Sequence, residues 1–425
     1  MLCKYFISEA ELEMRRRRAR TISLYKVLFS TYKAISNTIT EFKKATSKRK
    51  TSRGITQPRT RTRNTPIIMS DNTIHNGADF RPKKFSQIVG QNIVKEYLQL
   101  KIKAFKKSNN AVGHCLFLGF SGCGKTTMAN VMATEMGVRF HSIMATRIKT
   151  WNDFYQIIKN VETNDVVFID EIHALAPKIQ EQLYGVMEDF ICTLEDKNLQ
   201  QQIQVKLPRF TLIGATTHTG DLNAALLSRF QYKGQLVPYT HQELTDMVVA
   251  AGERIYDLDV PTEVAERIAK LSRRTARVCY NLLRSYVDVV EAEYDHKINS
   301  RMLSMDLLYK TLKLEQIDPI IGLDYVSRKY LLTMLKDQEM TPLGCRSIAN
   351  MINEQESTIT EMIEPFLTSD ILLEYKKEGK AISSCGPFSK VTKRGRVATQ
   401  NAYTYMKMCQ SLQTQGWFTN EAITI

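Results

Sequence analysis

The 425-residue sequence lacks long apolar stretches, closely spaced cysteine pairs and internal repeats. No apolar run reaches the roughly 18 residues that a membrane-spanning helix needs, so we expect no such helix. The eight cysteines include no CxxC pair, which argues against a zinc site or a dithiol redox site. We expect reduced and mostly buried thiols, as in an intracellular protein. The opening MLCKYFISEAELEM has acidic residues ahead of any basic cluster, the reverse of a secretory signal.

Positive charge is concentrated near the start of the chain. The formal net charge is +15, and residues 1–66 alone hold 17 basic and 4 acidic residues. The remaining 359 residues are therefore nearly neutral. Runs such as RRRRAR and RTRTR suit contacts with phosphate backbones or acidic surfaces, although a solvated disordered tail has the same composition.

The first 79 residues are expected to form a basic, largely disordered extension. Residues 22–44 have apolar side chains near helical spacing, which predicts one amphipathic helix. The following TSKRKTSRGITQPRTRTRNTP is typical of disorder. Met69 opens MSDNTIHNGADF, which has the look of an ordinary cytosolic N-terminus, so we hypothesise that translation starts there.

From residue 80 onward, short apolar runs alternate with helical stretches. HCLFLG, DVVFID and FTLIGATT each have the pattern of a buried strand. This alternation predicts an α/β fold with a parallel sheet flanked by helices. Residues 241–315 are expected to be mostly helical. After Pro319, further helices should lead to a basic hairpin.

Two motifs predict a nucleotide site. GFSGCGKT at 119–126 matches the P-loop pattern, between a predicted strand and a predicted helix. Its glycines let backbone N–H groups surround phosphates, Lys125 adds a positive charge, and Thr126 offers a hydroxyl to Mg²⁺. VVFIDEIH then brings Asp170 to the metal and places Glu171 as a candidate general base.

Three further stretches carry polar residues that could complete this site. LIGATT at 212–217 is a buried strand that ends in a threonine able to sense the γ-phosphate, although a Thr-rich turn would look the same. LLSRF offers Arg229 beyond that strand, where it could act from a neighbouring subunit or simply be a surface arginine. SRRTARV at 272–278 places arginines in the helical segment.

These pieces together resemble the RuvB family of AAA+ motors, which drive branch migration of Holliday junctions in bacteria. The resemblance runs from about residue 80 to about residue 406 without a missing block. It is carried by FRPKKFSQIVGQ, DEIH, MEDF, LPRFTLIGATT, LLSRF, RRTAR, GLD and RGRVATQNAY. Many AAA+ proteins share a P-loop, whereas this combination is far more specific.

The resemblance implies roles for residues at matching positions. It makes Thr217 the sensor on the third strand, Arg229 a finger acting in trans, and Arg277 a sensor in the helical domain. With Lys125, Asp170 and Glu171, these form the expected catalytic set. The residues expected to bind ATP and Mg²⁺ are Arg81, Val89, Gly90, Gly119, Gly122, Gly124, Lys125, Thr126, Thr127, Asp170, Glu188, Asp189, Phe190, Arg229, Tyr239 and Arg277. Arg81, Val89, Gly90 and Tyr239 would surround the adenosine, and Glu188 to Phe190 would lie near a neighbouring nucleotide.

The resemblance also implies the fold and the assembly. It predicts an α/β AAA+ P-loop ATPase domain with a parallel sheet at 80–240, a small helical domain at 241–318, a C-terminal winged helix at 319–406 and a tail at 407–425. It implies a homohexamer that threads duplex DNA in the cytoplasm of a bacterium, or of a phage's host. The hairpin at 189–210 would dock a RuvA-type junction-binding protein.

The chain departs from the family pattern in three places. Phe120, Ser121 and Cys123 replace proline or apolar residues of the P-loop, which changes side chains but not the backbone cradle. The 189–210 hairpin has a Gln-rich tip where relatives have glycine. Roughly 15 extra residues precede RGR, so we expect a longer wing. Residues 1–68 and 407–425 match nothing in the family pattern.

The basic residues of the winged helix are the best candidates for DNA contacts. They are Lys390, Lys393, Arg394 and Arg396, and a solvated wing is the alternative explanation for them. A few such contacts per subunit, multiplied around a ring, fit the nearly neutral charge of the body.

Two other functions remain open at this point. A clamp-loader-type ATPase would share the P-loop, the acidic pair and the finger arginine, but should lack the winged helix. A non-motor DNA-binding protein with an inactive nucleotide site would not need the complete catalytic set, from Lys125 to Arg277.

Overall fold

The computed structural model describes residues 80–108, 111–196, 201–217, 220–294, 298–336, 341–377, 380–418 and 423. The chain divides into two units, Met1–Asn72 and Thr73–Ile425, and all of the described residues belong to the second. The helix predicted at 22–44, the basic arm and Met69 lie outside the described residues.

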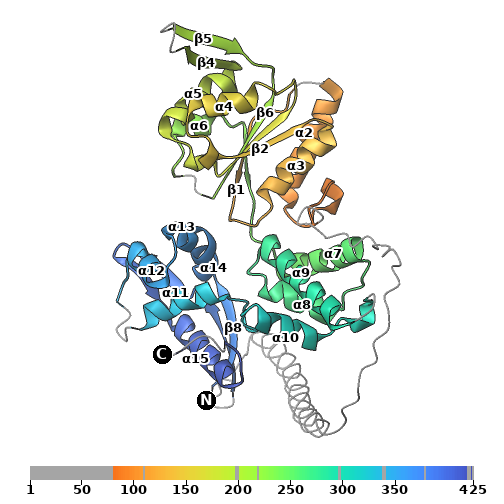
Figure 1. Cartoon of the computed structure of the whole chain (residues 1–425), viewed down its shortest axis with the longest axis vertical. Helices are drawn as coiled ribbons and strands as arrows, with labels where there is room; N and C mark the ends of the chain where they lie inside the picture. Colours follow the sequence, from red (N-terminus) through yellow and green to blue (C-terminus); the bar gives the residue numbers. More distant parts are fainter. Residues whose placement is uncertain are drawn as a thin grey trace, which may run out of the picture. The chain divides into compact units, whose positions relative to one another are not determined.

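A five-stranded parallel sheet forms the centre of the P-loop part (Figure 1). The strands are ordered β2-β3-β6-β1-β7, and every neighbouring pair is parallel. Their bounds are β1 Cys115–Leu118, β2 Phe140–Met144, β3 Val166–Asp170, β6 Thr211–Thr216 and β7 Tyr232–Gln235. The three predicted strands are the three central ones, because only strands buried on both faces have continuous apolar runs.

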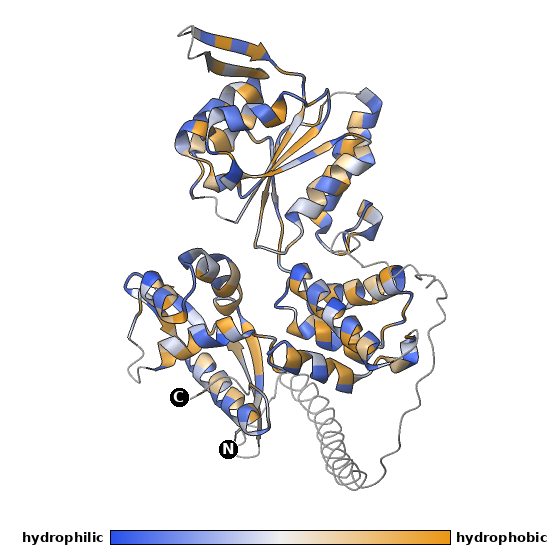
Figure 2. Cartoon of the chain, viewed as in Figure 1, coloured by the Kyte–Doolittle hydropathy of each residue, from blue (hydrophilic) through white to orange (hydrophobic). Residues whose placement is uncertain are grey.

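Helices cover both faces of this sheet (Figure 1). They are α2 Asn92–Ser108, α3 Lys125–Met136, α4 Trp151–Ile158, α5 Pro177–Glu188 and α6 Ala224–Arg229. Successive strand residues face opposite layers: Phe117 packs in the core that includes α2 and α3, whereas Leu116 packs in the core that includes α4, α5 and α6. Figure 2 shows the apolar residues of the strands and inner helix faces between these layers. The two cores fix the position of the sheet edge at which β1, β3 and β6 end.

The segment after the sheet is helical, as predicted. It contains α7 His241–Ala251, α8 Thr262–Leu271, α9 Ala276–Glu293 and α10 Met305–Leu314, with a π-helical turn at Gly252–Tyr256 and a 3-10 turn at Ser300–Met302. The Thr240 side chain begins α7 by accepting the N–H of Glu243, whose carboxylate reaches back to Thr240.

The C-terminal part has helices followed by two β-hairpins. Its helices are α11 Tyr325–Leu335, α12 Cys345–Ile352, α13 Glu356–Thr358, a π-helical turn Ile359–Ile363, α14 Glu364–Leu367 and α15 Gln400–Thr414. Its strands are β8 Ile371–Lys377, β9 Lys380–Gly386, β10 Ser389–Thr392 and β11 Gly395–Ala398. One apolar core runs through this part and the helical segment before it.

The prediction of a longer wing is wrong. The added residues form a separate antiparallel hairpin, β8–β9, and the wing that carries RGR is the short pair β10–β11. The two hairpins belong to different sheets. Pro387 lies between them, and proline has no N–H to continue a strand ladder.

The hairpin expected at 189–210 is present as β4 Ile191–Asp196 and β5 Gln201–Lys206, paired antiparallel. Residues 197–200 at its tip lie outside the described residues, whereas Gln201 and Gln202 of the Gln-rich stretch belong to β5. Ile203 on β5 is 44% exposed.

The tail packs against the molecule. α15 continues to Thr414, beyond the expected boundary at residue 406. Trp417, Phe418 and Ile423 are buried. The Trp417 ring meets Tyr309 of α10 edge-on at 6.5 Å, and the Arg328 guanidinium of α11 lies 4.0 Å from the centre of the Phe418 ring. The tail therefore contacts both α10 and α11.

Two further observations concern the described helices and cysteines. None of these helices is both long and apolar enough for a membrane span. The seven described cysteines are free thiols, of which only Cys385 is exposed.

Candidate active site

The P-loop connects β1 to α3 through a turn that glycine makes possible. Gly119, Gly122 and Gly124 have φ values of 146°, 83° and 96°, in the left-handed region that favours glycine. Gly124 directly precedes α3, so the free N–H groups at the start of this helix open onto the loop. Such a helix start is suited to binding phosphate.

Lys125 lies within this loop. Its side chain is buried, and Nζ donates hydrogen bonds to the carbonyl oxygens of Gly119, at 2.7 Å, and Phe120, at 3.3 Å. Burial lowers the pKa of Lys125, and the negative charges of Glu171 and Asp170 partly offset that shift. A buried ammonium group that faces two carboxylates is well placed to bind a polyphosphate.

Thr126 and Asp170 form a pair of oxygen donors suited to Mg²⁺. The Thr126 hydroxyl donates to Asp170 Oδ2 at 3.1 Å. Within the described ranges, no group of three His, Cys, Asp or Glu side chains could form a metal site by itself. Mg²⁺ is normally held by one or two protein oxygens together with substrate phosphates and water, so this pair fits it.

Glu171 is fixed next to the predicted sensor. Its φ of 49° is strained for a non-glycine residue, and it turns the chain at the end of β3. Glu171 Oε2 accepts hydrogen bonds from the Thr217 N–H at 3.4 Å and the Thr217 hydroxyl at 3.3 Å. Because β3 and β6 are parallel neighbours, both residues lie at the same edge of the sheet. The predicted base and sensor are therefore in contact.

His173 is a site residue that the motif analysis did not single out. Its Nδ1 lies 3.3 Å from Glu171 Oε2 and 2.9 Å from the Thr216 hydroxyl. The signal was present in the DEIH motif, where the histidine follows Glu171 by two positions. The imidazole links the ends of β3 and β6 and helps to orient the Glu171 carboxylate.

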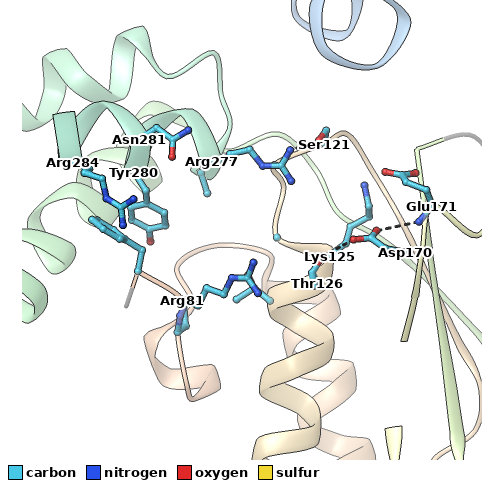
Figure 3. A pocket seen from close by; sticks show the side chains of 16 residues that line it. Arg81, Ser121, Lys125, Thr126, Asp170, Glu171, Arg277, Tyr280, Asn281 and Arg284 are labelled. Carbon is cyan, nitrogen blue, oxygen red and sulfur yellow. Dashed lines mark hydrogen bonds between the residues drawn. The ribbon is translucent and has the colours of Figure 1, made fainter. Parts of the chain in front are cut away.

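A cavity of about 280 Å³ joins these residues to α9 (Figure 3). Arg277 of α9 points toward the P-loop and donates from Nη1 to the Ser121 hydroxyl at 2.9 Å. The lining residues are Phe80, Arg81, Pro82, Ser121, Gly122, Gly124, Lys125, Thr126, Thr127, Asp170, Glu171, Ala276, Arg277, Tyr280, Asn281 and Arg284. The cavity thus brings together Arg81, Arg277 and the predicted residues Gly122, Gly124, Lys125, Thr126 and Thr127, whereas Gly119 and Thr217 do not line it.

One face of α9 supplies part of the cavity that sequence analysis missed. Tyr280, Asn281 and Arg284 follow Arg277 at helical spacing and line the same wall. The Tyr280 ring lies 5.4 Å from the Phe80 ring, and the Arg284 guanidinium is 5.2 Å from the same Phe80 ring. Aromatic and guanidinium groups of this kind suit a nucleotide base.

Three predicted adenosine contacts do not line the cavity. Val89, Gly90 and Tyr239 lie together on the flank of the P-loop, where the Tyr239 hydroxyl donates to the Cys123 carbonyl at 3.0 Å. A Cβ on Gly90 would come within 3.3 Å of the Tyr239 ring. Tyr239 therefore supports the loop, and the adenosine contacts of the three residues stay a prediction.

Arg229 lies apart from the cavity that contains Lys125, at the C-terminal end of α6. Its Nε is 3.1 Å from Glu188 Oε1, an ion-pair distance without an aligned hydrogen bond, and Nη1 donates to the Ala225 carbonyl at 2.6 Å. Its guanidinium stacks over Tyr184 at 4.1 Å. Glu188 and Arg229, both predicted to face a neighbouring nucleotide, are thus brought together.

A buried histidine packs beside Phe190, the residue after Asp189. His114 Nε2 lies 2.9 Å from the Met187 carbonyl, and the Leu212 N–H donates to His114 Nδ1 at 2.9 Å. Burial lowers the pKa of His114, while the hydrogen bond to Met187 acts in the opposite direction. A neutral imidazole with hydrogen on Nε2 satisfies both contacts. Phe190 packs 6.0 Å from this ring, and Asp189 is exposed.

The predicted DNA contacts separate into two groups. Lys390, Lys393 and Arg394 are exposed on the β10–β11 wing. Arg396 instead donates from Nε to the buried Glu364 carboxylate at 2.8 Å. We therefore assign Arg396 to holding the wing and keep the other three as candidate contacts.

Two segments of the chain match family models. Residues 80–236 match the Holliday junction DNA helicase RuvB P-loop domain. Residues 321–389 match the RuvB C-terminal winged helix domain. The first contains the cavity's P-loop and acidic residues, and the second contains α11 to α14, the β8–β9 hairpin and only the first residue of the β10–β11 wing.

Similar whole proteins support the same grouping. The chain is 36% identical over 332 residues to the Holliday junction branch migration complex subunit RuvB of Myxococcus xanthus, covering 78% of this chain and 90% of that protein. It also matches the solved structure of the Thermotoga maritima RuvB Holliday junction branch migration motor, with a TM-score of 0.64 and 31% identity. That match covers 77% of this chain and 98% of the solved one. A mutant of the same motor matches with a TM-score of 0.65.

Proposed function

Because the chain belongs to the RuvB family, we propose that it is an ATP-driven motor that moves duplex DNA and drives branch migration of Holliday junctions. The observation that carries the proposal is the P-loop cavity. There the Lys125 ammonium, the Thr126–Asp170 pair and the Glu171–Thr217 pair lie along one edge of the sheet. A chain with both this cavity and a winged helix can couple nucleotide chemistry to DNA.

The predicted catalytic residues have distinct parts in ATP hydrolysis. Lys125 binds the terminal phosphates, and Thr126 with Asp170 would hold Mg²⁺, which neutralises charge on those phosphates. Glu171 accepts a proton from the attacking water. Thr217 holds the Glu171 carboxylate through two hydrogen bonds, so the base is oriented before substrate arrives. Arg277 approaches from α9 and contacts the P-loop beside the phosphates.

We propose that Arg229 completes the active site of the neighbouring subunit in a homohexamer. Arg229 does not line its own chain's P-loop cavity, and neither does Glu188 or Asp189. Stacking on Tyr184 and the ion pair with Glu188 hold the guanidinium in place. An arginine presented in this way can stabilise charge on a phosphate bound by another chain.

The alternatives fit the chain less well. A clamp-loader-type ATPase would not need the winged helix that residues 321–389 match. A DNA-binding protein with an inactive nucleotide site would not need Glu171 fixed beside Thr217. We also propose that the β4–β5 hairpin, with its exposed Ile203, docks a RuvA-type partner, and that the motor works in the cytoplasm.

The function is tested by incubating the full chain with a labelled synthetic four-way junction, ATP and Mg²⁺, with and without a RuvA-type protein. We expect ATP-dependent conversion of the junction into two duplexes. The Lys125→Ala chain, which loses the phosphate-binding ammonium, is the matched control and should leave the junction intact. If ATP is hydrolysed but the junction persists even with the partner, branch migration is the wrong activity.

The wing should supply a measurable share of DNA binding. Replacing both Lys393 and Arg394, at the turn of β10–β11, by alanine removes two exposed charges without touching the core. The slope of log K against log salt should become shallower by about 0.9 for each lost phosphate contact. Fluorescence anisotropy with duplex DNA at several salt concentrations measures this slope. Lys159→Ala, at the end of α4, is the control and should not change it; an unchanged slope for the wing variant would show that the wing does not touch DNA.

A further inference from the structure

The turn between α8 and α9 has an unusual backbone. Two consecutive arginines, Arg273 and Arg274, have φ values of 49° and 58°. Left-handed conformations are costly for residues other than glycine, and they persist only where surrounding contacts hold them. Residues on one side of this turn contact the P-loop, and residues on the other side contact the start of the winged helix.

On one side, the turn is packed against the P-loop. A Cβ on Gly122 would lie 3.1 Å from the Arg277 Cβ and 3.2 Å from the Thr275 Cβ, so the loop backbone approaches the start of α9 closely. The Arg277 guanidinium also bonds to Ser121 of the loop. The P-loop and residues 275–277 are therefore in direct contact.

On the other side, the turn is fastened to the start of the winged helix. Arg273 Nη2 lies 2.8 Å from Asp324 Oδ2. Asp324 is the N-cap of α11, and its Oδ1 accepts the Ser327 N–H at 2.8 Å. A Cβ on Gly322 would come within 2.1 Å of the Leu271 carbonyl oxygen, so the two backbones touch at this point. The end of α8 and the beginning of α11 form one close junction.

The ion pair at this junction is partly shielded from solvent. The Arg273 side chain is 14% exposed and that of Asp324 is 41% exposed. Burial acts to raise the pKa of Asp324, but the Arg273 charge and the Ser327 hydrogen bonds outweigh it and lower the pKa overall. Asp324 is therefore ionised near neutral pH, and the pair carries opposite full charges.

We propose that Arg273 and Asp324 are a positioning pair that transmits the nucleotide state of the P-loop to the DNA-binding winged helix. The path is physically continuous: Gly122 contacts Thr275 and Arg277, the left-handed turn joins these to Arg273, and Arg273 holds the N-cap of α11. Neither member of the pair lines the nucleotide cavity, so the pair acts through other residues and not on the substrate. The inference rests on the proposed function only in taking the winged helix to bind DNA.

The test compares duplex DNA affinity with a non-hydrolysable ATP analogue and with ADP. Asp324→Asn removes the charge and keeps a side chain that caps helices well, and Arg273→Gln removes the other charge. Each substitution should move the ratio of the two DNA dissociation constants toward one. The expected change in this ratio is on the order of tenfold, which corresponds to about 1.4 kcal/mol of coupling between nucleotide and DNA binding. ATP turnover should stay within about threefold of that of the unmodified chain. Simple destabilisation of the fold would instead lower both turnover and the nucleotide dependence of DNA affinity.

A double variant tests whether the two residues act as a pair, and a matched control tests whether the effect is specific to them. If the two residues act as a pair, Arg273→Gln combined with Asp324→Asn should have no larger effect than either alone. Lys270→Gln, which removes the nearby ion pair with Glu374 at 3.4 Å, should leave the ratio unchanged. Arg273→Lys, which keeps the charge, should restore part of the coupling.

Four outcomes would overturn the proposal. Three concern the variants: unchanged nucleotide dependence, additive effects in the double variant, or an equal loss for Lys270→Gln. The fourth is an unmodified chain whose DNA affinity does not depend on the nucleotide. Failure of the junction assay is separate, because a chain that binds DNA without migrating junctions still reports whether nucleotide alters affinity. Thermal unfolding of each variant shows that it remains folded.

Discussion

A Glu171→Gln chain is expected to bind ATP normally and to hydrolyse it on the order of 10²- to 10⁴-fold more slowly. Glutamine has the shape of glutamate and can still accept hydrogen bonds from Thr217, so the edge of the sheet should be preserved. It cannot accept a proton from water, so the general base is lost. Phosphate release under saturating ATP measures turnover, and binding of a fluorescent ATP analogue measures affinity.

Lys125→Ala separates binding from chemistry in this experiment. It removes the buried ammonium that occupies the P-loop, so affinity itself should fall. A Glu171→Gln chain that turns over ATP at the unmodified rate would show that another group is the base. His173 would then be the next candidate, because its Nδ1 lies 3.3 Å from the same carboxylate.

The second large effect is expected for Arg229→Ala, which should lower turnover by about 10³- to 10⁵-fold with ATP binding retained. Binding should survive because Arg229 does not line the cavity with Lys125. Turnover should fall because the guanidinium held by Tyr184 and Glu188 would no longer reach the neighbouring nucleotide.

Mixing inactive chains distinguishes action in trans from action in cis. Arg229→Ala chains mixed with Lys125→Ala chains should regain activity, because some interfaces then join an intact P-loop to an intact arginine. An arginine acting in cis could not be rescued, since neither chain carries both groups. Light scattering confirms assembly, and ATPase activity across mixing ratios gives the answer. Assembled mixtures with no recovered activity would remove Arg229 from the trans role.

Sequence alone could predict the sheet edge that carries the candidate site, because its residues lie in short, continuous motifs. A P-loop needs glycines, lysine and threonine within eight positions, and the buried strands on either side are continuous apolar runs. The outer strands β2 and β7 were not predicted, because FHSIM and YKGQ mix polar and apolar residues. An edge strand is solvated on one side and lacks the apolar signal of a central strand.

Contacts between distant segments could not be read from local patterns. Arg396 looked like its basic neighbours, but its partner Glu364 lies 32 positions earlier and is buried. Phe80 and Tyr280 meet in the cavity from segments 200 positions apart. The sequence indicates that the segment before RGR is long. It does not indicate whether this segment lengthens the wing or forms its own hairpin, because that depends on the end of the β8–β9 ladder just before Pro387.

The buried tail bears on how the protein is cut and tagged for experiments. A chain shortened at residue 406, where the resemblance to the family pattern ends, would stop in the middle of α15, because that helix runs to Thr414. It would also lose Phe418, whose ring packs on the fully buried Arg328, and Trp417, whose ring packs on Tyr309 of α10. Protein shortened in this way should be prone to aggregate through the exposed surface. Purification handles therefore belong at the other end of the chain.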